Sequence, residues 1–228
     1  MFNRVVSFNG VSSIDAGVRY LNDRVASLLR EQKGFRGVIA SADRASGQLG
    51  VLTLWETEAE RDASESALLS SREESLRVVG GEMSVQNYEE GLAETAGPPA
   101  VGSVLLLLRI SIDPARFAGA LDSFKREVLP RMKASPGFRM VRLMLDPRTG
   151  EGRAGSIWAD KASMDAWEKG SEALRQQAAQ QGVTFTGRSE REIVFADLRL
   201  CSCGRPGAGP AARDRLVSSG LTAARAAP

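Results

Sequence analysis

Two tryptophans, Trp55 and Trp158, are the leading candidates for a binding site, because each ends an apolar run just before a polar stretch. The 228 residues contain no histidine. This excludes Ser/His and Cys/His nucleophile pairs, imidazole general bases, and histidine ligation of zinc, iron or haem. The cysteines, Cys201 and Cys203, are too close together for an ordinary disulfide and too few for a metal site. Aromatic and polar side chains therefore remain as the candidate site residues.

The two tryptophans belong to an internal repeat with a spacing of 103 residues. Residues 34–65 align with residues 137–168 without a gap, and 11 of the 32 aligned pairs are identical. Each half matches the order strand, helix, strand, strand, helix, strand. Hydrophobic periodicity, capping residues and glycine-ended loops mark the boundaries. In the first half the predicted strands are 4–11, 35–42, 49–55 and 83–89, with helices over 16–32 and 57–80. In the second half they are 104–112, 138–145, 152–158 and 191–199, with helices over 113–134 and 160–181.

This order is typical of the ferredoxin-like βαββαβ unit, an α+β sheet with both helices on one face. Strands such as VLLLLRI are apolar on both faces, so the open face of each sheet needs a cover. We predict two tandem ferredoxin-like repeats, residues 1–95 and 103–200, that pair their sheets into an intramolecular α+β barrel, a pseudo-dimer. Residues 96–102 form the predicted linker, and residues 201–228 a flexible tail rich in Gly, Pro, Ala and Arg.

Charge and hydropathy limit the partners and the location. No run reaches the roughly 18 apolar residues of a membrane helix, and the first residues lack the apolar segment of a secretory signal. Residues 1–97 carry 10 basic and 15 acidic side chains, and residues 98–200 carry 16 and 12. Opposite charges suit two halves that face each other, and no concentrated basic stripe marks a nucleic-acid binder. We expect a cytoplasmic protein without a nucleic-acid or membrane partner, in which further homo-oligomerisation remains open.

The halves differ in bulk beside the tryptophan. On the face of the third strand that carries Trp55, the first half has Leu49, Val51 and Thr53, whereas the second half has Gly152, Ala154 and Ser156 beside Trp158. Smaller residues leave room for a ligand or for a neighbouring side chain such as Trp167 or Phe138. We place a ligand beside Trp158, with Arg139 or Trp167 near its edge.

Each candidate also has a structural interpretation. Trp55 and Trp158 are core anchors if they only pack, and the presence of a tryptophan in both halves favours that role. Arg139 and its counterpart Arg36 fit a sheet edge or a domain interface better than a ligand site. Asn9 fits the end of a strand.

The sequence resembles the antibiotic biosynthesis monooxygenase (ABM) type of dimeric α+β barrel. The resemblance rests on PGF at 136–138, KGF at 33–35, the glycine-ended hairpins, and a strand that ends in Trp before an acidic helix, LWETEAERD and IWADKASMDAW. Members usually form the barrel between subunits, so the tandem copy implies a pseudo-dimer. They include cofactor-free oxygenases of aromatic polyketides, haem-degrading oxygenases, isomerases and proteins without a known activity.

The haem-degrading branch implies an Asn on the first strand, a Trp on the second helix and a His nine positions later. Asn9 and Trp167 meet the first two requirements in different halves, but Gln176 stands where the His should be. The equivalent first-half positions hold Ser64 and Glu73. The resemblance to this branch therefore does not extend to its chemistry, and we expect no cofactor and no metal.

The leading functional hypothesis is an ABM-like protein that binds a small apolar or aromatic molecule and acts as a cofactor-independent monooxygenase on a polyketide-like or quinol-like substrate. In that class the substrate supplies the electrons and the protein supplies an apolar pocket and polar groups. A second hypothesis is a non-catalytic relative with a structural or ligand-binding role. A third, an interaction adaptor, rests on the composition of the tail alone.

Overall fold

Local sequence signals set the ends of helices and hairpins in residues 1–199, the part of the chain that the computed structural model describes. The Thr57 hydroxyl caps a long helix by accepting a hydrogen bond from the backbone N–H of Glu60. Gly80 ends that helix with φ of 72°. Gly47 and Gly150, which close the two β-hairpins, have φ of 62° and 77°. Side chains with a Cβ avoid this left-handed region, so glycine is favoured at these turns.

Each half folds into four strands and two helical segments. The first half contains β1 (Phe2–Asn9), α1 (Ile14–Tyr20), η1 (Leu21–Val25), α2 (Ala26–Glu31), β2 (Phe35–Asp43), β3 (Gln48–Trp55), α3 (Glu58–Val79) and β4 (Glu82–Thr95). The second half contains β5 (Val104–Ser111), α4 (Pro114–Ser123), η2 (Phe124–Val128), α5 (Leu129–Ala134), β6 (Phe138–Leu145), β7 (Glu151–Trp158), α6 (Lys161–Gly170), α7 (Glu172–Gln180) and β8 (Thr184–Leu198).

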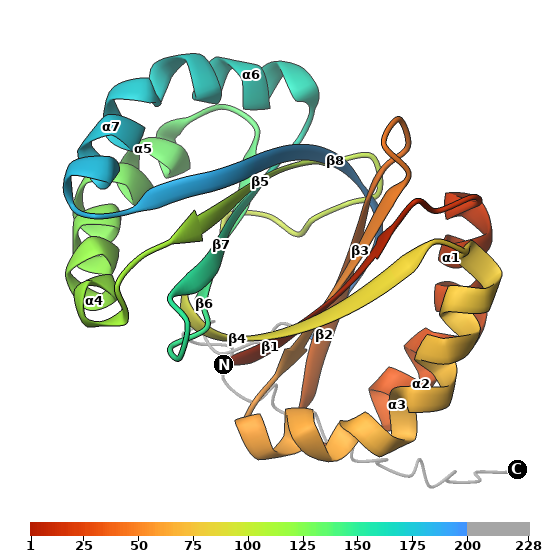
Figure 1. Ribbon diagram of the computed structural model, residues 1–228. Coiled ribbons are helices and arrows are strands. Elements are labelled where there is room, and N and C mark those ends of the chain that lie inside the picture. Colours follow the sequence, from red (N-terminus) through yellow and green to blue (C-terminus); the bar gives the residue numbers. More distant parts are fainter. Residues whose placement is uncertain (200–228) are drawn as a thin grey trace, which may run out of the picture.

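The strands form one closed barrel in the order β1-β3-β2-β8-β5-β7-β6-β4. Within each half this is the ferredoxin-like order, and antiparallel pairing of β2 with β8 and of β4 with β6 joins the halves. The helices α1–α3 cover one side of the barrel and α4–α7 cover the opposite side (Figure 1). The predicted α+β fold with sheets paired inside one chain is therefore confirmed.

Opposite charges meet where the halves join. Glu90 of β4 forms an ion pair with Arg142 of β6, and both side chains are buried. Nearby, Lys133 Nζ lies 3.2 Å from a carboxylate oxygen of Glu94. Ion pairs of the opposite sense, Arg30 with Asp197 and Arg44 with Glu192, also join the halves, so the pairing depends on local charges and not on the net charge of each half.

Several predicted elements differ from the structure, among them β4, which extends to Thr95 beyond the predicted end at 89. The helical segments predicted as regular over 16–32 and 113–134 each contain a π-helical turn, η1 and η2. The helix predicted over 160–181 breaks at Ser171, next to the poor helix former Gly170. The last strand begins at Thr184, well before the predicted start at 191, because pairing with β5 extends it.

Two further expectations concern the membrane and the tail. Within residues 1–199, no helix is both long and apolar enough to cross a membrane. The predicted tail, with Cys201 and Cys203, lies outside the described residues.

Because each half exposes two sheet edges and an apolar inner face without the other, residues 1–97 expressed alone are expected to self-associate or aggregate. Light scattering and size-exclusion chromatography measure this directly, with the full chain as the control. A well-behaved monomer of the fragment, without affinity for the second half, would contradict pairing of the halves as a folding requirement.

Candidate functional site

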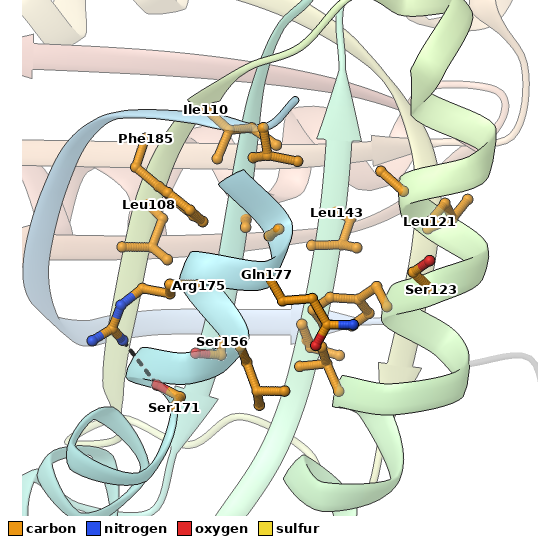
Figure 2. A pocket seen from close by; sticks show the side chains of 18 of the residues that line it. Leu108, Ile110, Leu121, Ser123, Leu143, Ser156, Ser171, Arg175, Gln177 and Phe185 are labelled. Atoms are coloured by element: carbon orange, nitrogen blue, oxygen red, sulfur yellow. Dashed lines mark hydrogen bonds between the residues drawn. The ribbon is translucent and has the colours of Figure 1, made fainter. Parts of the chain in front are cut away.

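A pocket of about 140 Å³ lies between the sheet and the helices of the second half (Figure 2). Strands β5, β6 and β7 form its floor, and α4, η2 and α7 form its walls. We call it the helix–sheet pocket. Its lining is mainly apolar and includes Leu106, Leu108, Ile110, Phe117, Leu121, Phe124, Val128, Val141, Leu143, Ala154, Trp167, Leu174 and Phe185. Such a lining is typical of sites for small apolar or aromatic molecules.

The π-helical turn η2 contributes directly to this wall. Phe124, Glu127 and Val128, three of its five residues, line the pocket. The equivalent turn η1 lies 103 residues earlier, so the irregularity belongs to the repeat. A π-turn widens the helix locally and re-aims side chains, which is why such turns often occur at functional sites.

The first half has a smaller pocket at the equivalent place, about 60 Å³, lined by Leu49, Val51 and Thr53. Larger side chains on β3 than on β7 explain part of the difference. Another part comes from Arg4, which pairs with Thr53 across the strands and also lines this smaller pocket. Its guanidinium forms ion pairs with Asp62 and Glu65 of α3. Ion pairs thus occupy the space that is apolar and open in the second half.

The second half carries an apolar residue at the position of Arg4. Leu106 pairs with Ser156 in the same register as Arg4 with Thr53. Both Leu106 and Ser156 line the helix–sheet pocket. Ser156 thus adds a hydroxyl to the mainly apolar floor of this pocket.

Trp158 lies under an aromatic stack at one end of the pocket. It is fully buried. The ring of Trp167 stacks on it at 5.6 Å and 24°, and Phe138 meets it edge-on at 5.5 Å and 66°. Trp167 lines the pocket, so the space directly on Trp158 is filled by a neighbouring side chain and the open volume lies further along β7.

Several polar side chains line the pocket, and Ser156 is the one on the sheet. Ser156 Oγ accepts a hydrogen bond from Trp158 Nε1 at 3.0 Å, which leaves its hydroxyl hydrogen to donate. In the first half, the Thr53 hydroxyl accepts the same bond from Trp55 but also donates to the Arg4 carbonyl at 3.3 Å. Ser156 is thus the freer of the two hydroxyls.

The other polar groups come from the helices, and Figure 2 shows Arg175 and Gln177 on α7. Gln177 donates a hydrogen bond to Glu127 and so links α7 to η2. That bond, with a further contribution from Arg126, holds the pKa of the Glu127 carboxyl below its ordinary value. Arg175 Nη1 donates to Ser171 Oγ at 2.8 Å. An ionised carboxylate and a guanidinium therefore line the same apolar pocket.

The remaining sequence candidates lie elsewhere. Arg139 contacts the segment that joins the halves, where its Nη1 lies 3.4 Å from the Pro98 carbonyl oxygen. Asn9 is exposed at the end of β1, and Trp55 is buried in the first half against Phe35. A Cβ at Gly152 would come within 3.1 Å of Ile110, so that position supplies no open space. Of the predicted set, Ala154, Ser156 and Trp167 line one pocket.

Sequence reasoning missed several pocket residues. Phe185 lies at the start of β8, in a segment not predicted to be a strand. Gln177 and Glu127 carried no signal, because two polar residues on different helices gave no reason to place them together. The helical pattern of Phe117, Leu121, Phe124 and Val128 was recognised, but only as a buried face.

Comparisons with known proteins establish the fold. No family model matches the chain. Two Mycobacterium tuberculosis proteins of the H37Rv strain, Uncharacterized protein Rv2558 and Uncharacterized protein Rv2557, are 25% and 23% identical. The first match covers 82% of this chain and 80% of the relative, and the second covers 82% and 84%.

Among solved structures, a proposed monooxygenase from Lactobacillus acidophilus matches with a TM-score of 0.64 at 13% identity, covering 87% of this chain and 96% of that chain. An anthrone oxidase-like protein matches with a TM-score of 0.62 at 11% identity, covering 87% and 94%. Both matches extend over the two halves. The protein therefore shares the α+β barrel fold of these solved structures, built here from two repeats in one chain.

A haem-degrading enzyme from Listeria monocytogenes also has this fold, with a TM-score of 0.50 at 11% identity over 84% of this chain and 99% of that chain. In the present chain, the position at which the resemblance to the haem-degrading branch implies a histidine holds glutamine. The chain has no histidine, and Gln176, nine positions after Trp167, is exposed on α7. Among residues 1–199, no three His, Cys, Asp or Glu side chains group as a metal site.

Proposed function

We propose that the protein binds a small aromatic molecule in the helix–sheet pocket and oxidises it with O₂ without a cofactor. The observation that carries the proposal is the difference between the halves: about 140 Å³ of apolar space in the second against about 60 Å³ in the first. Close-packed interiors rarely keep such space unless it is used. Similarity in fold to an anthrone oxidase-like protein supports the same class of substrate.

The proposed chemistry needs little from the protein. An activated aryl methylene, R₂CH₂, reacts with O₂ to give R₂C=O and H₂O, so the substrate supplies all four electrons and O₂ is the oxidant. Loss of a proton from the substrate starts the reaction, and the developing negative charge spreads into the aromatic system and its oxygen. A pocket accelerates this step by orienting the substrate and stabilising that oxyanion.

Residues that line the pocket can take these roles. The Arg175 guanidinium is placed to stabilise an oxyanion, and the Ser156 hydroxyl to donate a hydrogen bond to a substrate oxygen. Glu127 is the carboxylate on the lining, and it accepts the proton. Its lowered pKa makes it a weak base, which favours substrates whose methylene or phenol is itself acidic.

Oxygen consumption tests the proposal. Purified protein without added flavin or metal is expected to accelerate O₂ uptake with anthrone, and Ser156→Ala is expected to lower that rate about tenfold or more. Thr53→Val is the matched control, because it also leaves a tryptophan N–H unpaired but lies outside the pocket. Stability should fall in both variants, and Thr53→Val also loses the bond to the Arg4 carbonyl, whereas only Ser156→Ala should affect the rate.

Rates equal to buffer, across anthrones and hydroquinones, would contradict the oxygenase proposal. If those compounds still bind, measured by quenching of Trp167 fluorescence, the protein is a non-catalytic ligand-binding member of the fold. The weak basicity of Glu127 is the observation that favours this second function.

A further inference from the structure

The interior of the barrel contains three buried arginines. Arg142 of β6, Arg153 of β7 and Arg191 of β8 are 7%, 8% and 9% exposed. All three line a pocket of about 60 Å³, which we call the barrel pocket. Charged side chains are rarely this buried unless an opposite charge accompanies them.

Too few acidic side chains accompany these three arginines. Arg142 forms its ion pair with Glu90. Arg153, in contrast, donates to two neutral groups, the Tyr88 hydroxyl at 3.0 Å and the Gln86 side-chain oxygen. Arg191 donates to the neutral side-chain oxygen of Gln48 at 2.7 Å. Two guanidinium groups thus rely on uncharged partners.

The acidic group that attracts Arg191 is already engaged elsewhere. Asp43 accepts hydrogen bonds from Ser46 and from the backbone N–H of Ala45 in its own hairpin. Burial and repulsion from Arg153 and Arg109 lower the pKa of Arg191 below its ordinary value despite Asp43. The positive charges in this part of the barrel are therefore under mutual repulsion.

Several buried polar atoms also lack a hydrogen-bond partner. They are Nε of Arg191, Nε of Arg142, and both side-chain polar atoms of Asn3, which pairs with Tyr88 in the register. Each such group has a substantial unfavourable energy unless something satisfies it. Of these residues Arg191 and Arg142 line the barrel pocket, and their unfilled donors together with the positive charge indicate a missing acceptor with negative charge.

A glycine on β3 leaves space for one of these arginines. A Cβ on Gly50 would come within 2.7 Å of Nη1 of Arg191, so the glycine leaves space for that guanidinium. Arg109, which is exposed, pairs directly with Arg153 in the register and therefore shares its face of the sheet. The remaining lining is largely apolar and includes Val5, Ile39 and Leu107.

We propose that the barrel pocket binds a small oxyanion, a carboxylate or phosphate group, between Arg153 and Arg191. The planar guanidinium fork matches two oxygens of such a group, and apolar walls strengthen the attraction by excluding water. A pocket of about 60 Å³ has room for a few water-sized groups, which restricts the occupant to a small anion. Gly155 of β7 lines both pockets, so the anion site lies across the sheet from the helix–sheet pocket. The inference does not depend on the proposed oxygenase activity.

Calorimetric titration of the full chain with sodium phosphate and, separately, sodium acetate tests the site, with ionic strength held constant by NaCl. Saturable binding of at least one anion is expected, and the two titrations separate phosphate from carboxylate recognition. Arg191→Gln and Arg153→Gln should each weaken binding about tenfold or more. Arg148→Gln, at an exposed hairpin arginine, is the control and should leave binding unchanged.

Thermal unfolding separates an anion site from a purely structural arginine. Without added phosphate or acetate, Arg191→Gln should keep or raise Tm, because it removes a repelled buried charge. With the binding anion, Tm should rise for the wild type and for Arg148→Gln but not for Arg191→Gln. Arg191→Lys keeps the charge without the fork, and it should fold normally and bind more weakly.

Three results would overturn the inference. The first is the absence of binding heat with either anion. The second is an equal loss of affinity in Arg191→Gln and Arg148→Gln. The third is a much lower Tm of Arg191→Gln in chloride buffer, which would make Arg191 a structural residue.

Discussion

Replacing Trp158 with alanine is expected to lower the free energy of unfolding by about 3–5 kcal/mol, which corresponds to a fall in Tm of roughly 6–20 °C for a chain of this size. The indole is fully buried, packs against Phe138 and Trp167, and donates to Ser156. Alanine removes all of these contacts at once and leaves a cavity in a close-packed layer. Chemical denaturation followed by far-UV circular dichroism measures the loss.

Two matched variants show what is particular to this position. Trp55→Ala removes an equally buried tryptophan of the first half and should reduce stability by a similar amount, while ligand binding in the second half persists. Trp167→Ala removes a half-buried ring that lines the pocket and should reduce stability less. If Trp158→Ala lowers the free energy of unfolding by less than about 1 kcal/mol, Trp158 does not anchor the second half.

The architecture could be predicted because the sequence repeats. The same turn and capping signals occur in both halves and give the same order of strands and helices. The apolar inner face of each predicted sheet also required a partner sheet. Ala154 and Ser156 are smaller than their first-half counterparts, and this difference indicated the side of the sheet on which the larger pocket lies. That argument needed only the strand period of two and a comparison between the halves.

Features that depend on distant segments could not be predicted. Phe185 reaches the pocket because pairing with β5 extends β8, and local propensity does not encode that extension. The space at Gly152 is filled by the Met144 carbonyl oxygen and by Ile110 on the two neighbouring strands. Arg142 and Arg153 lie on paired strands of one hairpin, but Arg191 on β8 joins them through β5, and only closure of the barrel covers all three with first-half residues such as Val5 and Ile39. Counting every second residue along a strand identifies the side chains that share one face of the sheet. It does not identify which faces of distant strands meet in the folded protein.

The two halves share a fold but not a use for their outer pockets. In the first half, Arg4 and its acidic partners occupy the space, and the Thr53 hydroxyl is fully engaged. In the second half, Leu106 replaces Arg4, and Ser156 retains a hydrogen to donate. A serine, Ser64, occupies the first-half position of Trp167. Charged and hydrogen-bonded groups thus fill the first-half pocket, whereas the second-half pocket stays open and apolar, as the proposed ligand binding requires.

Ala154→Leu should abolish or weaken ligand binding, by about tenfold or more, while the free energy of unfolding changes by less than about 1 kcal/mol. Ala154 lies on the floor of the helix–sheet pocket, and leucine adds three carbon atoms that extend into its open space. If the space is empty without ligand, the added carbons displace nothing in the protein. Titration of an aromatic probe such as anthrone, followed by Trp167 fluorescence, measures affinity, and chemical denaturation measures stability.

The first half provides the matched control for this last substitution. Val51, 103 residues before Ala154, lines the first-half pocket, so Val51→Leu enlarges a side chain at the equivalent position without touching the proposed site. Anthrone affinity should be unchanged in Val51→Leu. If Ala154→Leu instead destabilises the fold by about 1–3 kcal/mol, neighbouring side chains already occupy the space. Unchanged affinity in a stable Ala154→Leu protein would show that the ligand binds elsewhere. Either result would exclude the pocket floor at β7 as the binding surface. In the first case side chains already fill the space, and in the second a ligand bound there would have been displaced by the leucine.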